Sequence, residues 1–168
     1  MRRSLTSLSK ILLVGASLFL LGCTETPKSN IPTLTGRVVD NAGVLSTSEK
    51  KSLSGYLADV DKETKAEIIV LTMESLPEDE NLEEYTNKVF NAWRIGKRDS
   101  DSGLLFVLVT GTRKIRIEVG RGNEGNMPDM IANRIAKEQM APRFKEGKFY
   151  LGFMDAASES VKYIKKGN

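Results

Sequence analysis

The chain has 168 residues, with no histidine, one cysteine and a formal net charge of +3 at neutral pH. Without histidine it can form neither a Ser-His-Asp triad nor a His-Glu-x-x-His zinc site. Three of the 25 basic residues lie in the first 22 positions, which leaves 22 bases against 22 acids in the rest of the chain, so we expect no nucleic-acid partner.

The N-terminus has the pattern of a targeting signal. A basic start is followed by an apolar run over 11–21 that is too short to span a bilayer as a mature helix. The run ends in Leu20-Leu21-Gly22-Cys23, which resembles the lipobox of bacterial lipoproteins. The resemblance implies that Cys23 is lipidated and becomes the first residue of the mature chain. The alternative is an ordinary secretory peptide whose cleavage leaves Cys23 free.

We therefore expect residues 1–22 to be a lipoprotein signal peptide and the chain to be anchored in the cell envelope by acyl chains such as palmitate. Thr24 is not an aspartate, so we expect the outer membrane, facing the periplasm, if the organism has two membranes. Residues 23–36 are rich in Thr, Pro and Ser, which indicates a flexible tether. One domain follows over 37–168.

Hydrophobic periodicity predicts the helices and strands in the first half of this domain. A capping box from Ser46 to Glu49 opens a helix over 47–64. A nearly continuous apolar run over 66–73 is typical of a strand buried on both faces. The helical spacing of Leu and aromatic residues predicts a second helix from about 82 to 93. We expect these aromatic side chains to pack in the core rather than to bind a ligand.

The second half begins with the most hydrophobic strand, over 103–110. A short turn then requires the next strand, over 115–119, to be antiparallel. Further helices are expected over 128–140, ended by Pro142, and over 151–165. The order strand, helix, strand implies a right-handed parallel crossover. The predicted fold is an α/β three-layer sandwich, with a mixed central sheet flanked by about four helices.

This topology brings two loops to one edge of the sheet, those over 96–102 and 120–126. Both should lie where the 103–110 strand begins and its antiparallel partner ends. Carboxylates without histidine or free cysteine favour hard cations, so we expect a site for Ca²⁺ or Mg²⁺ here. The candidate ligands are Asp99, Asp101, Glu124 and Asp129.

Each of these motifs has another interpretation. Gly120, Gly122 and Gly125 spell the dinucleotide motif G-x-G-x-x-G, but Glu124 lies where a pyrophosphate would sit. The Asp99–Asp101 pair may be read as a polar turn that bonds its own backbone, and Asp129 as an acid that complements a helix dipole. Arginines 98, 113 and 121 are candidates for holding a phosphate or carboxylate, or are simply solvated.

The domain resembles the TPM domain family over about residues 37–163. The resemblance is carried by Val39-Asp40-Asn41-Ala42-Gly43-Val44-Leu45-Ser46, by Phe90-Asn91-Ala92-Trp93-Arg94-Ile95-Gly96, by Asp101-Ser102-Gly103-Leu104-Leu105 and by Arg116-Ile117-Glu118-Val119-Gly120-Arg121-Gly122-Asn123-Glu124-Gly125. Met127-Pro128-Asp129 and Pro142-Arg143-Phe144 complete it. The resemblance implies an α/β sandwich in exported or membrane-associated proteins, divalent-cation binding in some members, and a phosphatase activity attributed to a plant thylakoid relative.

Two functions follow as hypotheses. The first is a non-catalytic lipoprotein that uses cation-ordered loops to bind a membrane-protein partner. The second is a metal-dependent phosphatase that hydrolyses phosphate monoesters with a metal-activated water. The sequence favours the binding module, because no nucleophile or general base is evident.

Overall fold

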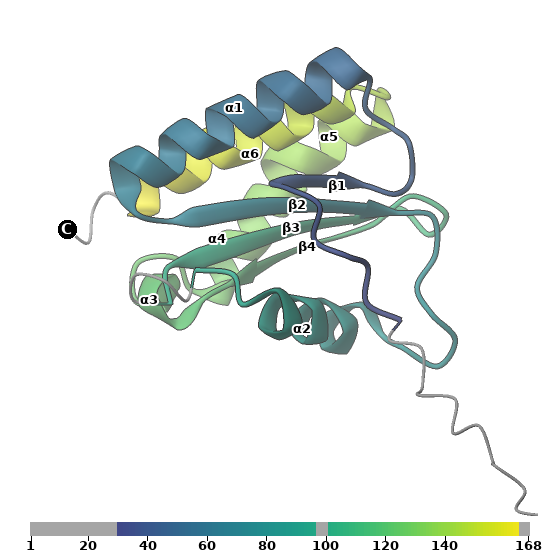
Figure 1. Cartoon of the computed structure of the whole chain (residues 1–168), viewed down its shortest axis with the longest axis horizontal. Helices are drawn as coiled ribbons and strands as arrows, with labels where there is room; N and C mark the ends of the chain where they lie inside the picture. The colour runs from purple at the N-terminus through teal and green to yellow at the C-terminus, as the bar shows by residue number, and fades with distance from the viewer. Residues whose placement is uncertain (1–29, 97–100, 165–168) are drawn as a thin grey trace, which may run out of the picture.

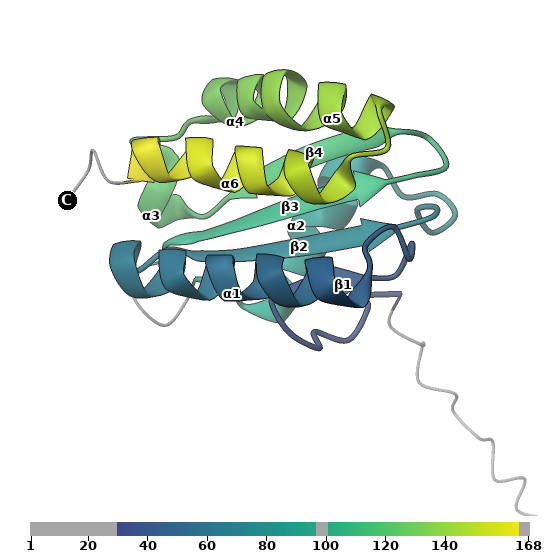
Figure 2. The same ribbon diagram turned by 90° about the horizontal axis from the view of Figure 1, so that it is seen from above.

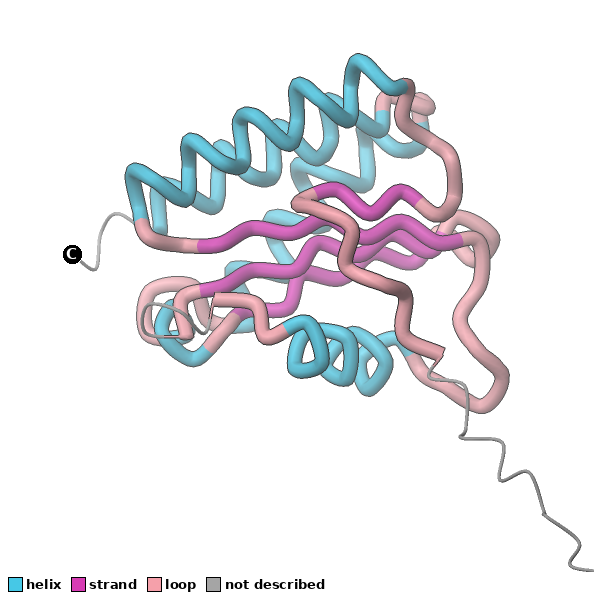
Figure 3. Tube along the Cα trace, viewed as in Figure 1, coloured by secondary structure: helices cyan, strands magenta, loops and turns pink. Residues whose placement is uncertain are grey.

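The computed structural model describes residues 30–96 and 101–164. A four-stranded sheet in the order β1-β2-β3-β4 forms its centre. Helices cover both faces of the sheet (Figures 1 and 3), which confirms the predicted α/β sandwich. The strands are β1 (Val38–Asp40), β2 (Glu67–Met73), β3 (Gly103–Val109) and β4 (Lys114–Val119). The helices are α1 (Thr47–Thr64), α2 (Leu82–Trp93), α3 (Arg121–Glu124), α4 (Asp129–Ile135), the π-helix η1 (Ala136–Met140), α5 (Ala141–Lys145) and α6 (Phe149–Ile164).

Strands β2 and β3 form the middle of the sheet. They pair in parallel from Glu67 opposite Gly103 to Met73 opposite Val109. Every residue of β3 is buried, as the continuous apolar run predicts for a strand covered on both faces. The hairpin to β4 is antiparallel and β1 adds to β2 in parallel, so the sheet is mixed.

Five helical segments cover one face of the sheet. Seen from above, α1 and α6 lie side by side and the α4–η1–α5 segment lies beside α6 (Figure 2). The larger hydrophobic cluster fills the space beneath these helices. It includes Leu57 of α1, Phe153 of α6, Phe106 of β3 and Ile117 of β4. Ile115 and Val119 pack against this cluster too, so alternate residues of β4 face it.

Helix α2 covers the opposite face. It begins with Asn81, whose side chain accepts a hydrogen bond from Glu84 N. Tyr85, Val89 and Phe90 then pack on the second hydrophobic cluster. Arg116 and Glu118 of β4 point to this face, where Glu118 accepts a hydrogen bond from Asn87 of α2 at 3.1 Å. The polar face of β4 therefore contacts the helix rather than solvent alone.

Asn30 and Pro32, which precede β1, contact α2. The Tyr85 hydroxyl donates to Asn30 O at 3.0 Å, and the Trp93 indole donates to Pro32 O at 2.8 Å. Burial, followed by the negative charge of Glu80, raises the pKa of Tyr85, which keeps this hydroxyl a donor. Both acceptors lie within residues 23–36, the predicted tether, whose residues 33–36 are exposed. The predicted signal peptide and Cys23 lie outside the described residues.

The prediction that Pro142 ends a helix is wrong. The chain remains helical through Pro142 to Lys145, by way of the π-helix η1. Proline cannot donate to the carbonyl one α-helical turn earlier, and a wider π turn accommodates this loss. The continuation carries Phe144 and Lys145 to the end of the sheet.

Strand β1 was not predicted, because it has only three residues. Its last residue, Asp40, organises the loop that follows. The carboxylate accepts from Val44 N and Leu45 N, both at 3.1 Å, and from the hydroxyl of Thr72. This loop lies at the end of the sheet where β2 and β3 finish, away from the loops that precede these strands.

Among residues 30–96 and 101–164, no helix is both long enough and apolar enough to cross a bilayer.

Candidate functional site

The predicted neighbouring loops do meet at the edge of the sheet where β3 begins and β4 ends. Gly120 N donates to Gly103 O at 2.8 Å, which continues the β3–β4 ladder by one step. Gly122 N then donates to Asp101 O at 3.2 Å. We call this edge the rim and define it as the described residues of 96–103 together with 120–129.

Close backbone approach at the rim requires glycine. A Cβ on Gly120 would overlap Asp101 O and lie 3.1 Å from Gly103 N. A Cβ on Gly103 would lie 2.8 Å from the carbonyl carbon of Ile95, at the end of α2. The ends of α2 and β4 and the start of β3 are therefore in contact backbone to backbone.

The glycine motif has a structural role here. The N–H groups of Gly120 and Gly122 are bonded to the neighbouring loop, so neither is available to a pyrophosphate. A Cβ on Gly125 would meet nothing within 4 Å, and its φ of −63° suits any residue. This geometry agrees with the argument from Glu124 against a dinucleotide site.

Asp101 holds the first loop in position. It adopts a φ of 56°, a left-handed conformation that Asp tolerates better than most residues. Its carbonyl accepts from both Gly103 N and Gly122 N at 3.2 Å. Asp101 itself is half-buried. Because hydrogen bonds from both loops fix its backbone, the position from which its carboxylate extends is also fixed.

A buried side-chain pair lies beneath Asp101. Ser102 donates to Oδ1 of Asn123 at 3.0 Å, and the two residues are only 8% and 3% exposed. The other amide atom of Asn123, Nδ2, is buried without a hydrogen-bond partner. A buried donor left unpaired costs roughly 1–3 kcal/mol. The rim therefore contains an unsatisfied polar group that sequence reasoning missed, because the glycines on either side of Asn123 hid the short helix α3 that buries it.

The acidic residues at the rim are not equally placed. Glu124 ends the short helix α3 and Asp129 begins α4, and both are exposed. Asp99 lies outside the described residues. Within the described part of the chain, no group of three His, Cys, Asp or Glu side chains is close enough together to hold a metal ion. The metal assignment of Asp99, Asp101, Glu124 and Asp129 stays a prediction.

Glu67, at the start of β2, contacts the rim, although the sequence analysis did not single it out. Its carboxylate accepts from Gly96 N at 2.8 Å and its own N–H donates to Ser102 O at 2.9 Å. It thereby joins the end of α2 to the start of β3. The available signal was the parallel register, which sets Glu67 opposite Gly103.

Fold and rim together define an α/β sandwich domain whose paired loops meet at one edge of a mixed sheet. The model of the TPM domain matches residues 38–163, about three-quarters of the chain. The chain belongs to the TPM domain family.

Solved structures show the same architecture. The N-terminal domain of a protein from P. gingivalis is 30% identical, with a TM-score of 0.71 over 82% of this chain and 90% of that one. The BA42 protein of the psychrophilic bacterium Bizionia argentinensis is 19% identical, with a TM-score of 0.64 over 73% and 82% of the two chains. The N-terminal domain of cg2496 from Corynebacterium glutamicum is 16% identical, with a TM-score of 0.61 over 80% and 84%. No curated protein sequence matches the chain.

Proposed function

We propose that this TPM-domain protein is a lipid-anchored module of the cell envelope whose rim binds Ca²⁺ or Mg²⁺ and then contacts a membrane protein. The supporting observation is the direct contact between the two rim loops, made by Gly122 N with Asp101 O and by Ser102 with Asn123. Because these contacts fix the loops, the carboxylates of Asp101 and Glu124 belong to one edge. Their donor atoms are oxygens, which suit these two cations.

Asn123 supplies an additional oxygen in this proposal. If its side-chain amide turns by 180°, Nδ2 donates to the Ser102 hydroxyl. Oδ1 then occupies the position where Nδ2 now lies without a hydrogen-bond partner. A cation near that position favours the turned amide, since amide oxygens are ligands for Ca²⁺. The proposed ligand set is therefore Asp101, Asn123 and Glu124, with Asp99 and Asp129 completing it.

Binding, rather than phosphate hydrolysis, is the proposed activity. Within the described residues, Ser102 is the hydroxyl next to Asp101 along the chain, and it is buried and engaged with Asn123. It is not presented for direct attack on a phosphoryl group. A lipid anchor would raise the effective concentration of the module at the membrane, so a weak contact with a partner suffices.

Titration of residues 24–168 with Ca²⁺ and Mg²⁺, followed by amide NMR, tests the cation site. We expect saturable shifts at 101–103 and 120–129 in the same titration. Asp101→Asn and Glu124→Gln should weaken binding by about tenfold or more. The matched control is Asp59→Asn, which removes an exposed carboxylate of α1. Equal binding by all variants would remove the rim from the proposal.

Two further measurements separate the functions. Crosslinking in intact envelopes should recover a membrane protein with the native chain and less of it with Glu124→Gln. Hydrolysis of a generic phosphate monoester, measured with and without metal, should stay at the background rate. Metal-dependent turnover that Asp101→Asn abolishes would instead establish the phosphatase.

A further inference from the structure

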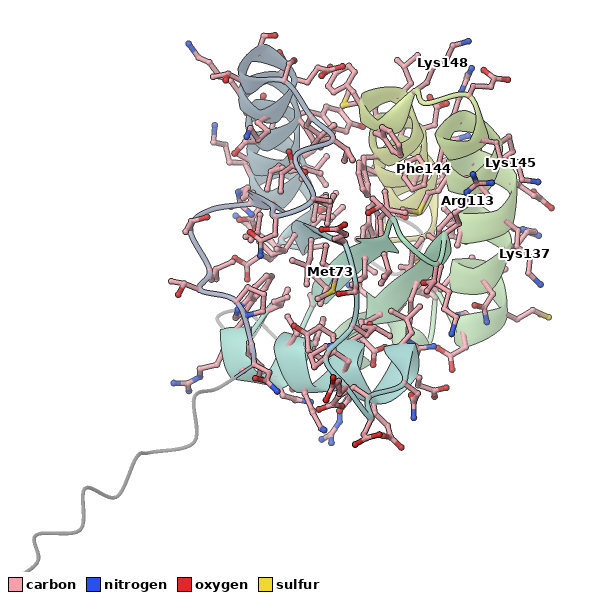
Figure 4. All side chains as sticks on the ribbon, turned by 90° about the vertical axis from the view of Figure 1, so that its right-hand side faces the viewer. Met73, Arg113, Lys137, Phe144, Lys145 and Lys148 are labelled. Carbon is pink, nitrogen blue, oxygen red and sulfur yellow. The ribbon has the colours of Figure 1, made fainter. Side chains whose placement is uncertain are left out.

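A pocket of about 390 Å³ lies at the opposite end of β3 from the rim. We propose that it binds a small amphipathic anion, a molecule with an apolar body and one carboxylate or phosphate group. The β3–β4 hairpin forms one side, and α5 with the start of α6 forms the other. The lining of the pocket includes Arg113 of the hairpin turn, Ala141, Phe144 and Lys145 of α5, and Phe149 of α6. Figure 4 shows Arg113, Phe144 and Lys145 near one another at this end.

The apolar wall of the pocket is held by packing. The ring of Phe144 lies 5.5 Å from that of Phe149 and 4.9 Å from that of Phe153, centroid to centroid. Behind it, Gly152 leaves room for the ring, because a Cβ there would lie 2.8 Å from Phe144 Cδ1. A preformed aromatic wall suits an apolar body, since ligand pockets are mostly apolar with a few placed polar groups.

The charge at the mouth of the pocket is positive and uncompensated. Arg113 and Lys145 are exposed lining residues, and no acid lines the pocket. Within the described residues neither cation makes an ion pair, whereas Lys148 pairs with Glu146 at 2.8 Å. The hydrogen bond from Lys148 lowers the pKa of the Glu146 carboxyl, so this acid is ionised and already engaged. Two unpaired cations beside an aromatic wall favour an amphipathic anion over a neutral ligand.

The backbone of Arg113 supports a functional role for its side chain. Its φ is 54°, at the last position of the hairpin turn, where glycine fits without strain. A left-handed residue with a Cβ is strained, and such residues cluster at functional sites. Lys65 and Arg94 share this conformation, but they end helices, where a left-handed residue is common, and Arg113 does not. The structure thus shows a basic residue kept at a position that favours glycine.

The place in the fold agrees with a ligand site. The pocket lies where the parallel strands end, the side of open α/β sheets on which ligands bind. The π-helix η1 ends next to Ala141 in the pocket wall, and π-bulges occur frequently at functional sites. The seven residues of β3 separate this end from the rim by about 20 Å, so the site is independent of the proposed cation site.

The test uses the full chain, labelled with 4-fluorophenylalanine, in phosphatidylcholine nanodiscs. The probe is 1-naphthoate, and the uncharged match is 1-naphthalenemethanol. We expect naphthoate to shift the fluorine resonances of Phe144 and Phe149 saturably and to leave that of Phe90, on the other face of the sheet, unchanged. Equal affinity for the alcohol would overturn the proposal, because it would show an apolar gap without anion recognition.

Variants separate binding from folding. Arg113→Gly and Lys145→Gln should each weaken naphthoate about fivefold, a loss suited to an exposed charge. The matched control for the first is Lys65→Gly, since Lys65 is also an exposed basic residue with a φ of 62°, at the far end of α1. Native affinity in Arg113→Gly and Lys145→Gln would overturn the proposal.

A last arm identifies the source of the anion. Phosphatidylglycerol replaces part of the phosphatidylcholine in the nanodiscs. If the Phe144 resonance shifts without naphthoate, and naphthoate then binds more weakly, the ligand is an anionic lipid of the bilayer. If the spectrum is unchanged and naphthoate still binds, the ligand is a free molecule. Both results support the pocket, and absence of binding in every arm overturns it. Calcium binding at the rim would be unaffected by any of these outcomes.

Discussion

The two ends of β3 are built in different ways. At the rim, where β3 begins, backbone meets backbone, and glycines at positions 103 and 120 make that contact possible. At the pocket, where β3 ends, side chains meet side chains, and Phe144 is set among other aromatic rings. The difference teaches that a substitution at the rim acts first on the fold, whereas one at the mouth of the pocket acts first on binding.

Gly120→Ala should have the largest effect. The new Cβ would overlap Asp101 O, a backbone atom that cannot move without breaking its hydrogen bond with Gly122 N. We expect the free energy of unfolding to fall by about 3 kcal/mol. Urea denaturation measures it. Gly125→Ala is the matched control, because its Cβ meets open space, and it should be close to neutral. If both variants lose the same stability, rigid backbone contact does not define the rim.

Thr72→Val tests how much a buried side-chain hydrogen bond stabilises the end of the sheet near the pocket. Thr72 is fully buried; its hydroxyl donates to Asp40 and accepts from Ala42 N at 3.2 Å. Valine keeps the shape but removes both interactions, so a buried carboxylate loses a donor. We expect a loss of about 2 kcal/mol in thermal or urea unfolding. A change below about 0.5 kcal/mol would mean that Val44 N and Leu45 N satisfy Asp40 without it.

Gly152→Ala should disturb the pocket more than the fold. The added Cβ would overlap Phe144 Cε1 and lie 3.1 Å from Arg143 Cβ, so the ring of Phe144 must shift toward the open pocket. We expect a loss of about 1 kcal/mol in unfolding free energy, with a displaced Phe144 resonance. Gly55→Ala, in α1 with open space around it, is the control and should be stabilising. An undisturbed Phe144 would argue against a fixed aromatic wall.

The sequence predicted the elements whose signal is local. The apolar runs of β2 and β3 and the capping box of α1 each carry their own pattern, and chain order alone brought the two rim loops together. Strand β1 escaped prediction because three residues have no period. Pro142 misled because a π turn accommodates its missing N–H, so the chain stays helical through it.

The pocket was not predicted for a related reason. It joins the hairpin at Arg113 to the α5–α6 connection at Phe144 and Phe149, which are about 30 residues apart in the chain. Arg113 was noted as a possible anion ligand, but neither its positive φ nor its apolar neighbours are visible in composition or spacing. Glu67 likewise needed the parallel register before its place at the rim could be seen.

Arg113→Gly should have the smallest effect on stability. It should raise the free energy of unfolding, whereas the three preceding variants lower it. Glycine relieves the strain of a left-handed residue, although it also gives the unfolded chain more freedom, so we expect a net gain of about 0.5 kcal/mol. Lys65→Gly should gain a similar amount for the same reason, and urea denaturation of both variants measures it. Only Arg113→Gly should lose naphthoate affinity. A variant that folds better and binds worse shows that the native arginine is kept for its side chain. A stability loss in Arg113→Gly would show instead that the arginine supports the hairpin, and the contrast between the two ends of β3 would then disappear.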